Sequence, residues 1–94
     1  MEMKLKRNGN VIEVEGLIKT MADSKTLNEE VKNVEDNEVI IRIYDSFGLP
    51  SSVIGHLMKL KDEGKNIVLE VKEESLYDLL DNLMLTEELN VKKI

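Results

Sequence analysis

The sequence predicts an α/β domain: a sequential βα superhelix, with a mostly parallel sheet that begins with an N-terminal hairpin. Short runs rich in β-branched residues alternate with segments whose apolar residues recur at helical spacing. An Asn-Gly pair lies between the first two strand-like runs, as it does in tight hairpins. Charged residues such as Arg42 and Glu70 interrupt the strands at alternate positions. This alternation predicts helices mainly on one face and a partly solvated opposite face.

The length and charge of the chain narrow the classes of function. Its 94 residues predict a single domain, and the absence of Cys excludes disulfides, thiolate metal sites and a Cys nucleophile. The net charge is −6, and because phosphate contacts dominate nucleic-acid affinity, we expect no nucleic-acid partner. No apolar run reaches membrane-spanning length, and residues 1–6 do not form a signal peptide. We therefore expect no membrane insertion and a cytoplasmic location.

The expected elements follow one another without repeats. They are a hairpin around Arg7–Asn10, a helix over about 21–34, a strand over 39–44, a helix between Pro50 and Gly64, a strand over 66–71, a helix from about Ser75 to Leu83 and a final strand over 89–94. Leu27, Val31 and Val34 share one face of the first helix. Thr26-Leu27-Asn28-Glu29 fits a capping box, so that helix starts either near Met21 or near Thr26.

The stretch from Val39 to Gly64 organises the rest of the chain. Val39–Tyr44 is rich in β-branched residues and too short for a helix, which indicates a buried central strand. Pro50 is favoured in the first turn of a helix, and Gly64 lies where a left-handed C-terminal cap belongs. The turn between these elements follows the carboxyl end of a strand, where open α/β sheets place their functional surface.

The third helix should begin at Ser75–Asp78, which resembles a capping box with Asp in place of Glu. Its apolar stripe consists of Leu76, Leu79, Leu80 and Leu83. The predicted core includes Ile41, Ile43, Leu57, Leu79 and Leu80.

The residues for common catalytic sites are missing. His56 is the one histidine, so no second imidazole completes a triad or a typical metal site. We interpret His56 as a solvent-facing or half-buried helix residue. No Walker motif or Gly-rich dinucleotide fingerprint is present. We therefore expect a protein that is not an enzyme and that uses no metal or cofactor.

The turn Asp45-Ser46-Phe47-Gly48-Leu49 is the remaining candidate site. A Ser near a helix N-terminus is suited to accept a phosphate, because free N–H groups and the helix dipole favour negative charge there. The alternative interpretation is local turn chemistry, in which Asp and Ser form nearby hydrogen bonds and Gly adopts an unusual backbone conformation.

The chain resembles the STAS domain family, whose founding members are bacterial anti-sigma factor antagonists. Residues 45–49 match the Asp-Ser-x-Gly-Leu motif of that family, and Gly64–Val68 matches its turn into the next strand. The resemblance implies a protein partner, a kinase-like anti-sigma factor that phosphorylates Ser46 and is thereby released. It places the partner-binding surface on Asp45, Ser46, Phe47, Gly48, Leu49, Ser51 and Ser52.

Two departures from the family pattern leave alternatives open. Phe47 replaces a small residue, and Pro50-Ser51-Ser52 adds a second pair of serines. If the helix begins at Ser51, the phosphate acceptor becomes Ser51 or Ser52. Other functions also remain: a STAS-like subunit of a transport or sensory complex without phosphorylation, or a small-ligand or nucleotide-binding module that uses the same helix N-terminus.

Overall fold

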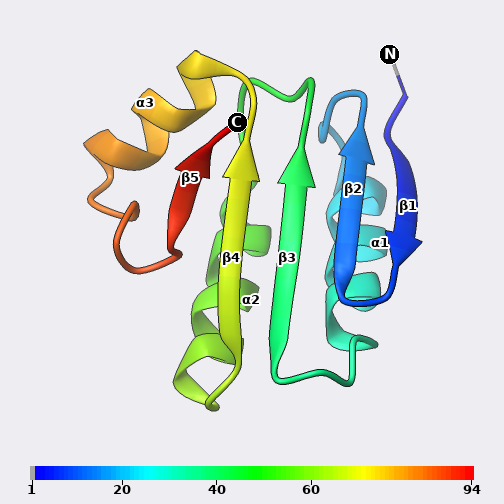
Figure 1. Cartoon of the computed structure of the whole chain (residues 1–94). Coiled ribbons are helices and arrows are strands. Elements are labelled where there is room, and N and C mark those ends of the chain that lie inside the picture. Colours follow the sequence, from blue (N-terminus) through cyan, green and yellow to red (C-terminus); the bar gives the residue numbers. More distant parts are fainter. Residues whose placement is uncertain (1) are drawn as a thin grey trace.

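The computed structural model describes residues 2–94; Met1, the first residue of the predicted domain, lies outside the described residues. The elements are β1 (Lys4–Asn8), β2 (Val11–Glu15), α1 (Met21–Lys32), β3 (Glu38–Ile43), α2 (Ser51–Asp62), β4 (Asn66–Val71), α3 (Glu74–Asn82) and β5 (Val91–Lys93). The strands form one five-stranded sheet in sequential order (Figure 1). β1 is antiparallel to β2, and the other neighbours are parallel. The prediction of an α/β fold with a mostly parallel sheet and an N-terminal hairpin is confirmed.

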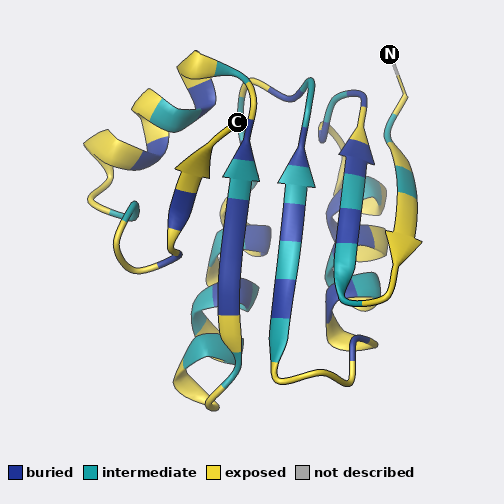
Figure 2. Cartoon of the chain, in the orientation of Figure 1, coloured by how far each residue is buried: buried dark blue, intermediate teal, exposed yellow. Residues whose placement is uncertain are grey.

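One face of the sheet carries the apolar core. Val39, Ile41 and Ile43 of β3 are at most 1% exposed, and they alternate with half-buried residues along the strand (Figure 2). α1 and α2 lie side by side on one face, behind the sheet in Figure 1, as the alternation predicted. α3 lies beside β5 at the edge of the sheet, where Leu76 and Leu80 are fully buried.

The start of α1 corrects the expected capping box at Thr26. Thr20 is the N-cap: its hydroxyl accepts from the N–H of Asp23 at 3.0 Å, and the Asp23 carboxylate accepts from the N–H of Thr20 at 3.1 Å. The box therefore uses Asp where Glu is usual. The backbone N–H of Lys19 also donates to this carboxylate, and these bonds lower the pKa of Asp23.

Predictions for the C-terminal third need similar corrections. α3 begins at Glu74 after the N-cap Glu73, with no side-chain capping bond, so the expected box at Ser75 is wrong. Leu79 is 38% exposed and is not a core residue, because the edge position of α3 buries only a narrow stripe of the helix. Leu89 is fully buried but precedes β5, which is shorter than the expected strand.

The end of α2 confirms the cap expected at Gly64. This glycine has a φ of +99°, in the left-handed region. Its N–H donates to the carbonyl of Lys61 at 3.0 Å, and the N–H of Lys65 donates to the carbonyl of Leu60 at 2.9 Å. These two bonds form a Schellman motif, which satisfies the last carbonyls of the helix.

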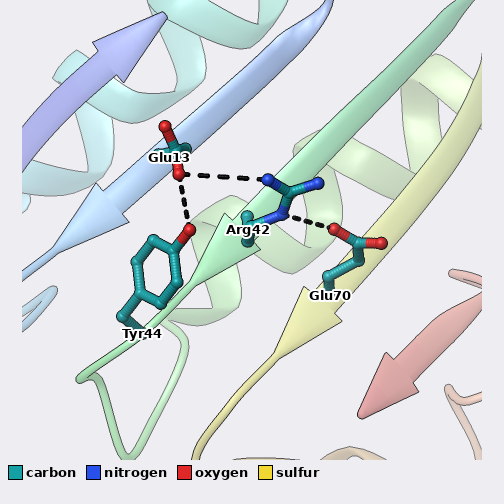
Figure 3. A network of polar contacts seen from close by, with 4 residues as sticks. All are labelled: Glu13, Arg42, Tyr44 and Glu70. Atoms are coloured by element: carbon teal, nitrogen blue, oxygen red, sulfur yellow. Dashed lines mark hydrogen bonds and ion pairs between the residues drawn. The ribbon is translucent and has the colours of Figure 1, made fainter. Parts of the chain in front are cut away.

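The opposite face of the sheet carries a row of charges with alternating sign. The strand register aligns Lys6, Glu13, Arg42, Glu70 and Lys92, one on each strand. Arg42 donates to Glu70 at 2.6 Å and lies 3.9 Å from Glu13, while the hydroxyl of Tyr44 also donates to Glu13 (Figure 3). Opposite charges on neighbouring strands stabilise the pairing, so these charged residues favour this register.

Burial of Leu57 gives the first prediction. Leu57→Ala should lower the free energy of unfolding by about 2–5 kcal/mol, because the side chain is 0% exposed and its removal leaves a cavity. Leu83→Ala is the control, since Leu83 is 52% exposed; its loss should stay within about 0.5 kcal/mol. Chemical denaturation measures both values. A loss below about 1 kcal/mol for Leu57→Ala would contradict the placement of Leu57 in the core.

The hydrogen bond between Tyr44 and Glu13 gives the second prediction. Glu13 raises the pKa of Tyr44, because deprotonation would put a phenolate beside a carboxylate; Arg42 opposes this shift but does not cancel it. Ultraviolet titration should show a tyrosine step above the ordinary value of about 10. The step should fall in Glu13→Gln and vanish in Tyr44→Phe.

The sign of the linkage follows from the raised pKa. The stability that this bond contributes is complete below the unfolded pKa of about 10, and it is lost as the pH rises through the higher folded pKa. A titration in which Tyr44→Phe retains the upper step would refute the assignment.

Candidate functional site

The candidate site lies at the carboxyl ends of the parallel strands β2, β3 and β4, at the top of Figure 1. Residues 44–50 form the β3–α2 turn, which contains the motif residues. The loop after β2 leads into α1 at the same edge, so the N-termini of α1 and α2 both lie there. This arrangement follows from parallel strands joined by helices on one side.

Two polar residues of the turn bind the backbone of the loop after β2. The N–H of Gly16 donates to Asp45 Oδ2 at 2.7 Å, and the N–H of Ile18 donates to Ser46 Oγ at 3.2 Å. Ser46 Oγ in turn donates to the carbonyl of Gly48 at 2.8 Å, and Ser46 is 2% exposed. We call the two bonds to Gly16 and Ile18 the loop link. The bond from Ser46 to Gly48 matches the interpretation of local turn chemistry, whereas the loop link joins segments far apart in the chain. The unusual backbone conformation expected for Gly48 is wrong, because its φ is not positive.

The backbone at Gly16 has no room for a side chain. Its φ is +84°, in the left-handed region, and a Cβ at this position would lie 2.0 Å from the carbonyl oxygen of Glu2. No larger residue fits without a shift of the backbone. The sequence pattern did not identify Gly16 or Ile18 as partners of the turn. A glycine directly after a strand was the one available signal.

The motif residues divide into an inward and an outward set. Ser46 and Leu49 are buried, with Leu49 8% exposed in the core. Asp45 and Gly48 are half-buried. Phe47 is 59% exposed, and Ser51 and Ser52 are exposed on the first turn of α2. The most exposed residues of this surface are therefore Phe47 and the two serines.

The N-terminus of α2 has no side-chain cap. Pro50 is the N-cap and not a first-turn residue, so the helix begins at Ser51. This is the helix start for which Ser51 or Ser52 was the expected phosphate acceptor. The carbonyl of Pro50 accepts from the N–H groups of Val53 and Ile54, whereas within residues 2–94 no backbone carbonyl accepts from the N–H of Ser51 or Ser52. The first turn of α2 also contains no acidic residue. Free N–H groups and the helix dipole give this end a preference for negative charge.

His56 lies one turn further along α2 and is half-buried, within the range expected for it. Burial lowers its pKa, and the nearby Lys59 and Lys32 add to this effect, while Glu63 opposes it. In the part of the chain that the structure describes, no three His, Asp or Glu side chains are grouped so that they could hold a metal ion. None of the helices in that part has the length and apolar character needed to cross a membrane.

The loop link gives the third prediction. Ser46→Ala should reduce the free energy of unfolding by about 1–3 kcal/mol, because the buried N–H of Ile18 loses its acceptor. The matched control is Ser51→Ala, an exposed serine five residues away, whose effect should stay within about 0.5 kcal/mol. Thermal or urea unfolding measures both variants. Equal losses in the two variants would show that Ser46 has no special role in holding the turn.

Comparisons with known proteins leave the family of this chain open. The chain matches no model of a known protein family, and no curated protein shows significant similarity to it. The functional assignment therefore depends on the residues of the β3–α2 turn and on the motif that they form.

Proposed function

We propose that this protein is a regulatory protein–protein interaction domain of the STAS type, which docks a protein partner through the β3–α2 turn and the first turn of α2. Phosphorylation of a serine on this surface releases the partner. The observation that carries the proposal is the 59% exposed Phe47, held on the linked turn that leads into the exposed Ser51 and Ser52.

Phe47 supports the docking role because large aromatic side chains dominate the energetics of many interfaces. The residues on either side of Phe47 are fixed: Ser46 is hydrogen-bonded to Ile18 and Gly48, and Leu49 is in the core. The turn is therefore ordered before a partner arrives. Such pre-organisation lowers the entropic cost of binding.

The exposure of the serines supports a specific choice of acceptor. The family resemblance places the phosphate on Ser46, but this hydroxyl is buried and engaged in two hydrogen bonds. A kinase could reach it only after the loop link opens. Ser51 and Ser52 are accessible without any rearrangement. We therefore assign the acceptor to Ser51 or Ser52, the alternative that a helix starting at Ser51 makes available.

The effect of the phosphate follows from its charge. A phosphoserine adds about −1.5 to −2 charge at pH 7. The free N–H groups at the start of α2 accommodate this charge, so the fold tolerates the modification. A partner that packs on Phe47 would have to bury the phosphate without a counter-charge, which is costly. We propose a kinase-like protein as the partner, and a non-enzymatic role without metal or cofactor for this chain.

Mass spectrometry after incubation with ATP and an extract of the native host tests the acceptor, and it gives the fourth prediction. Phosphate should map to Ser51 or Ser52, and the double variant Ser51→Ala/Ser52→Ala should abolish the incorporation. Ser46→Ala is the control and should retain it. Phosphate confined to Ser46 would overturn the assigned acceptor. No incorporation at any of the three serines would favour a scaffold subunit that is not phosphorylated.

Cross-linking through this surface identifies the partner, and the affinity of the chain for that partner tests the docking role. Phe47→Ala should weaken binding by about thirtyfold, the effect of losing an aromatic hot spot of about 2 kcal/mol. Met84→Ala is the control, because Met84 is 84% exposed but follows α3, outside the turn and α2. Equal losses in both variants would indicate unspecific hydrophobic contact and not docking at the turn.

A further inference from the structure

A groove of about 310 Å³ lies between α1 and α2. α1 contributes Met21, Lys25, Asn28 and Lys32 to its walls, and α2 contributes Ser52 and His56. This volume is at the lower end of the range of about 300–1,000 Å³ for small-molecule sites. Its size therefore suits a small molecule.

The walls of the groove combine apolar surface with unpaired positive charge. Met21 is 90% exposed, and the methylene stems of the lysines extend the apolar surface. Glu29 also lines the groove, yet no ion pair joins Lys25 or Lys32 to a carboxylate within residues 2–94. Two unpaired ammonium groups at one groove are notable in a chain with a net charge of −6. They favour a ligand with a negative charge.

Two polar atoms at the groove lack partners. Asn28 Oδ1 and His56 Nδ1 are buried, and neither forms a hydrogen bond within the described residues. The amide nitrogen of the same Asn28 donates across the groove to the carbonyl of Ser52 at 3.4 Å. Buried polar groups without a partner are uncommon. His56 Nδ1 can donate to a carboxylate when it carries the ring proton, whereas Asn28 Oδ1 is an acceptor and cannot bind an anion.

We infer that the α1–α2 groove binds small amphiphilic carboxylates. The apolar body of the ligand lies against Met21 and the lysine stems, and its carboxylate lies between the ammonium groups of Lys25 and Lys32. His56 lines the same groove and senses the bound charge. This inference goes beyond the proposed docking function and shares one residue, Ser52, with the docking surface.

Titration of the full chain with octanoate tests the inference and gives the fifth prediction. His56 is the single histidine, so its ring signals in the NMR spectrum report on the groove without ambiguity. The signals should shift and saturate with octanoate below its micellar concentration. In the free protein, burial, Lys59 and Lys32 lower the pKa of His56, and Glu63 opposes this shift. A bound carboxylate should raise this pKa. Lys25 and Glu29 contribute the remaining charges at the groove.

Three matched arms separate charge recognition from general hydrophobic binding. Octanol has the same alkyl chain without the charge, and it should bind the parent protein about fivefold or more weakly than octanoate does. Octanoate should lose a similar factor in affinity for the double variant Lys25→Gln/Lys32→Gln. Lys72→Gln is the control, since Lys72 is exposed and lies outside the groove, and its affinity should stay within about twofold of the parent.

Other outcomes would overturn the inference. Equal affinity for octanol and octanoate would remove the role of the lysines. Octanoate-induced shifts confined to other exposed apolar residues, such as Leu83 and Met84, with unchanged His56 signals would place the binding elsewhere. Absence of any saturable shift would show that the groove binds no such ligand.

Discussion

The candidate site depends on the link between the end of β3 and the loop that follows β2. Asp45 and Ser46 accept hydrogen bonds from the backbone of Gly16 and Ile18, and thereby join segments that are 29 and 28 residues apart in the chain. Each bond satisfies a backbone N–H that leaves the sheet and has no ladder partner. With both loops fixed, the turn that carries Phe47 and leads into α2 has a constant position. Asp45 and Ser46 therefore fix the turn, while Phe47, Ser51 and Ser52 form its exposed surface.

The two faces of the sheet differ in character, one apolar and one charged, because side chains alternate between the faces along each strand. On one face, Ile41 and its neighbours pack against α1 and α2 and form the core. On the other, Arg42 lies between Glu13 and Glu70, and the strand register extends this alternation of charge to the outer strands. The charged face stabilises the order of the strands without a covering helix. α1 and α2 cover the other face, and the groove lies between them.

Much of this architecture could be predicted from the sequence because it depends on local patterns. β4 coincides with the expected strand over 66–71, and Gly64 has the expected cap conformation. Element ends were less predictable: a capping box with Asp23 was overlooked in favour of one at Thr26. Leu79 fits the apolar stripe of α3, but its exposure depends on where the helix meets the edge of the sheet. Periodicity alone contains no information on that placement.

The site was predictable only in part for a related reason. The pattern located the turn and its alternatives Ser51 and Ser52, but it could not show which side chains point inward. The burial of Ser46 results from its contact with Ile18, a residue far away in sequence. The groove between α1 and α2 likewise depends on how the two helices pack, and residues such as Lys25 and His56 show no joint pattern along the chain.

Native-state hydrogen exchange of the Gly16 and Ile18 amides tests the loop link most directly, because both N–H groups lie outside any strand. The account predicts that both amides exchange as slowly as the amide of Tyr44, which donates to the carbonyl of Val14 at the same edge of the sheet. Exchange as fast as that of a solvent-exposed loop amide would show that Asp45 and Ser46 do not hold the turn. The orientation of Phe47, Ser51 and Ser52 would then have no structural basis.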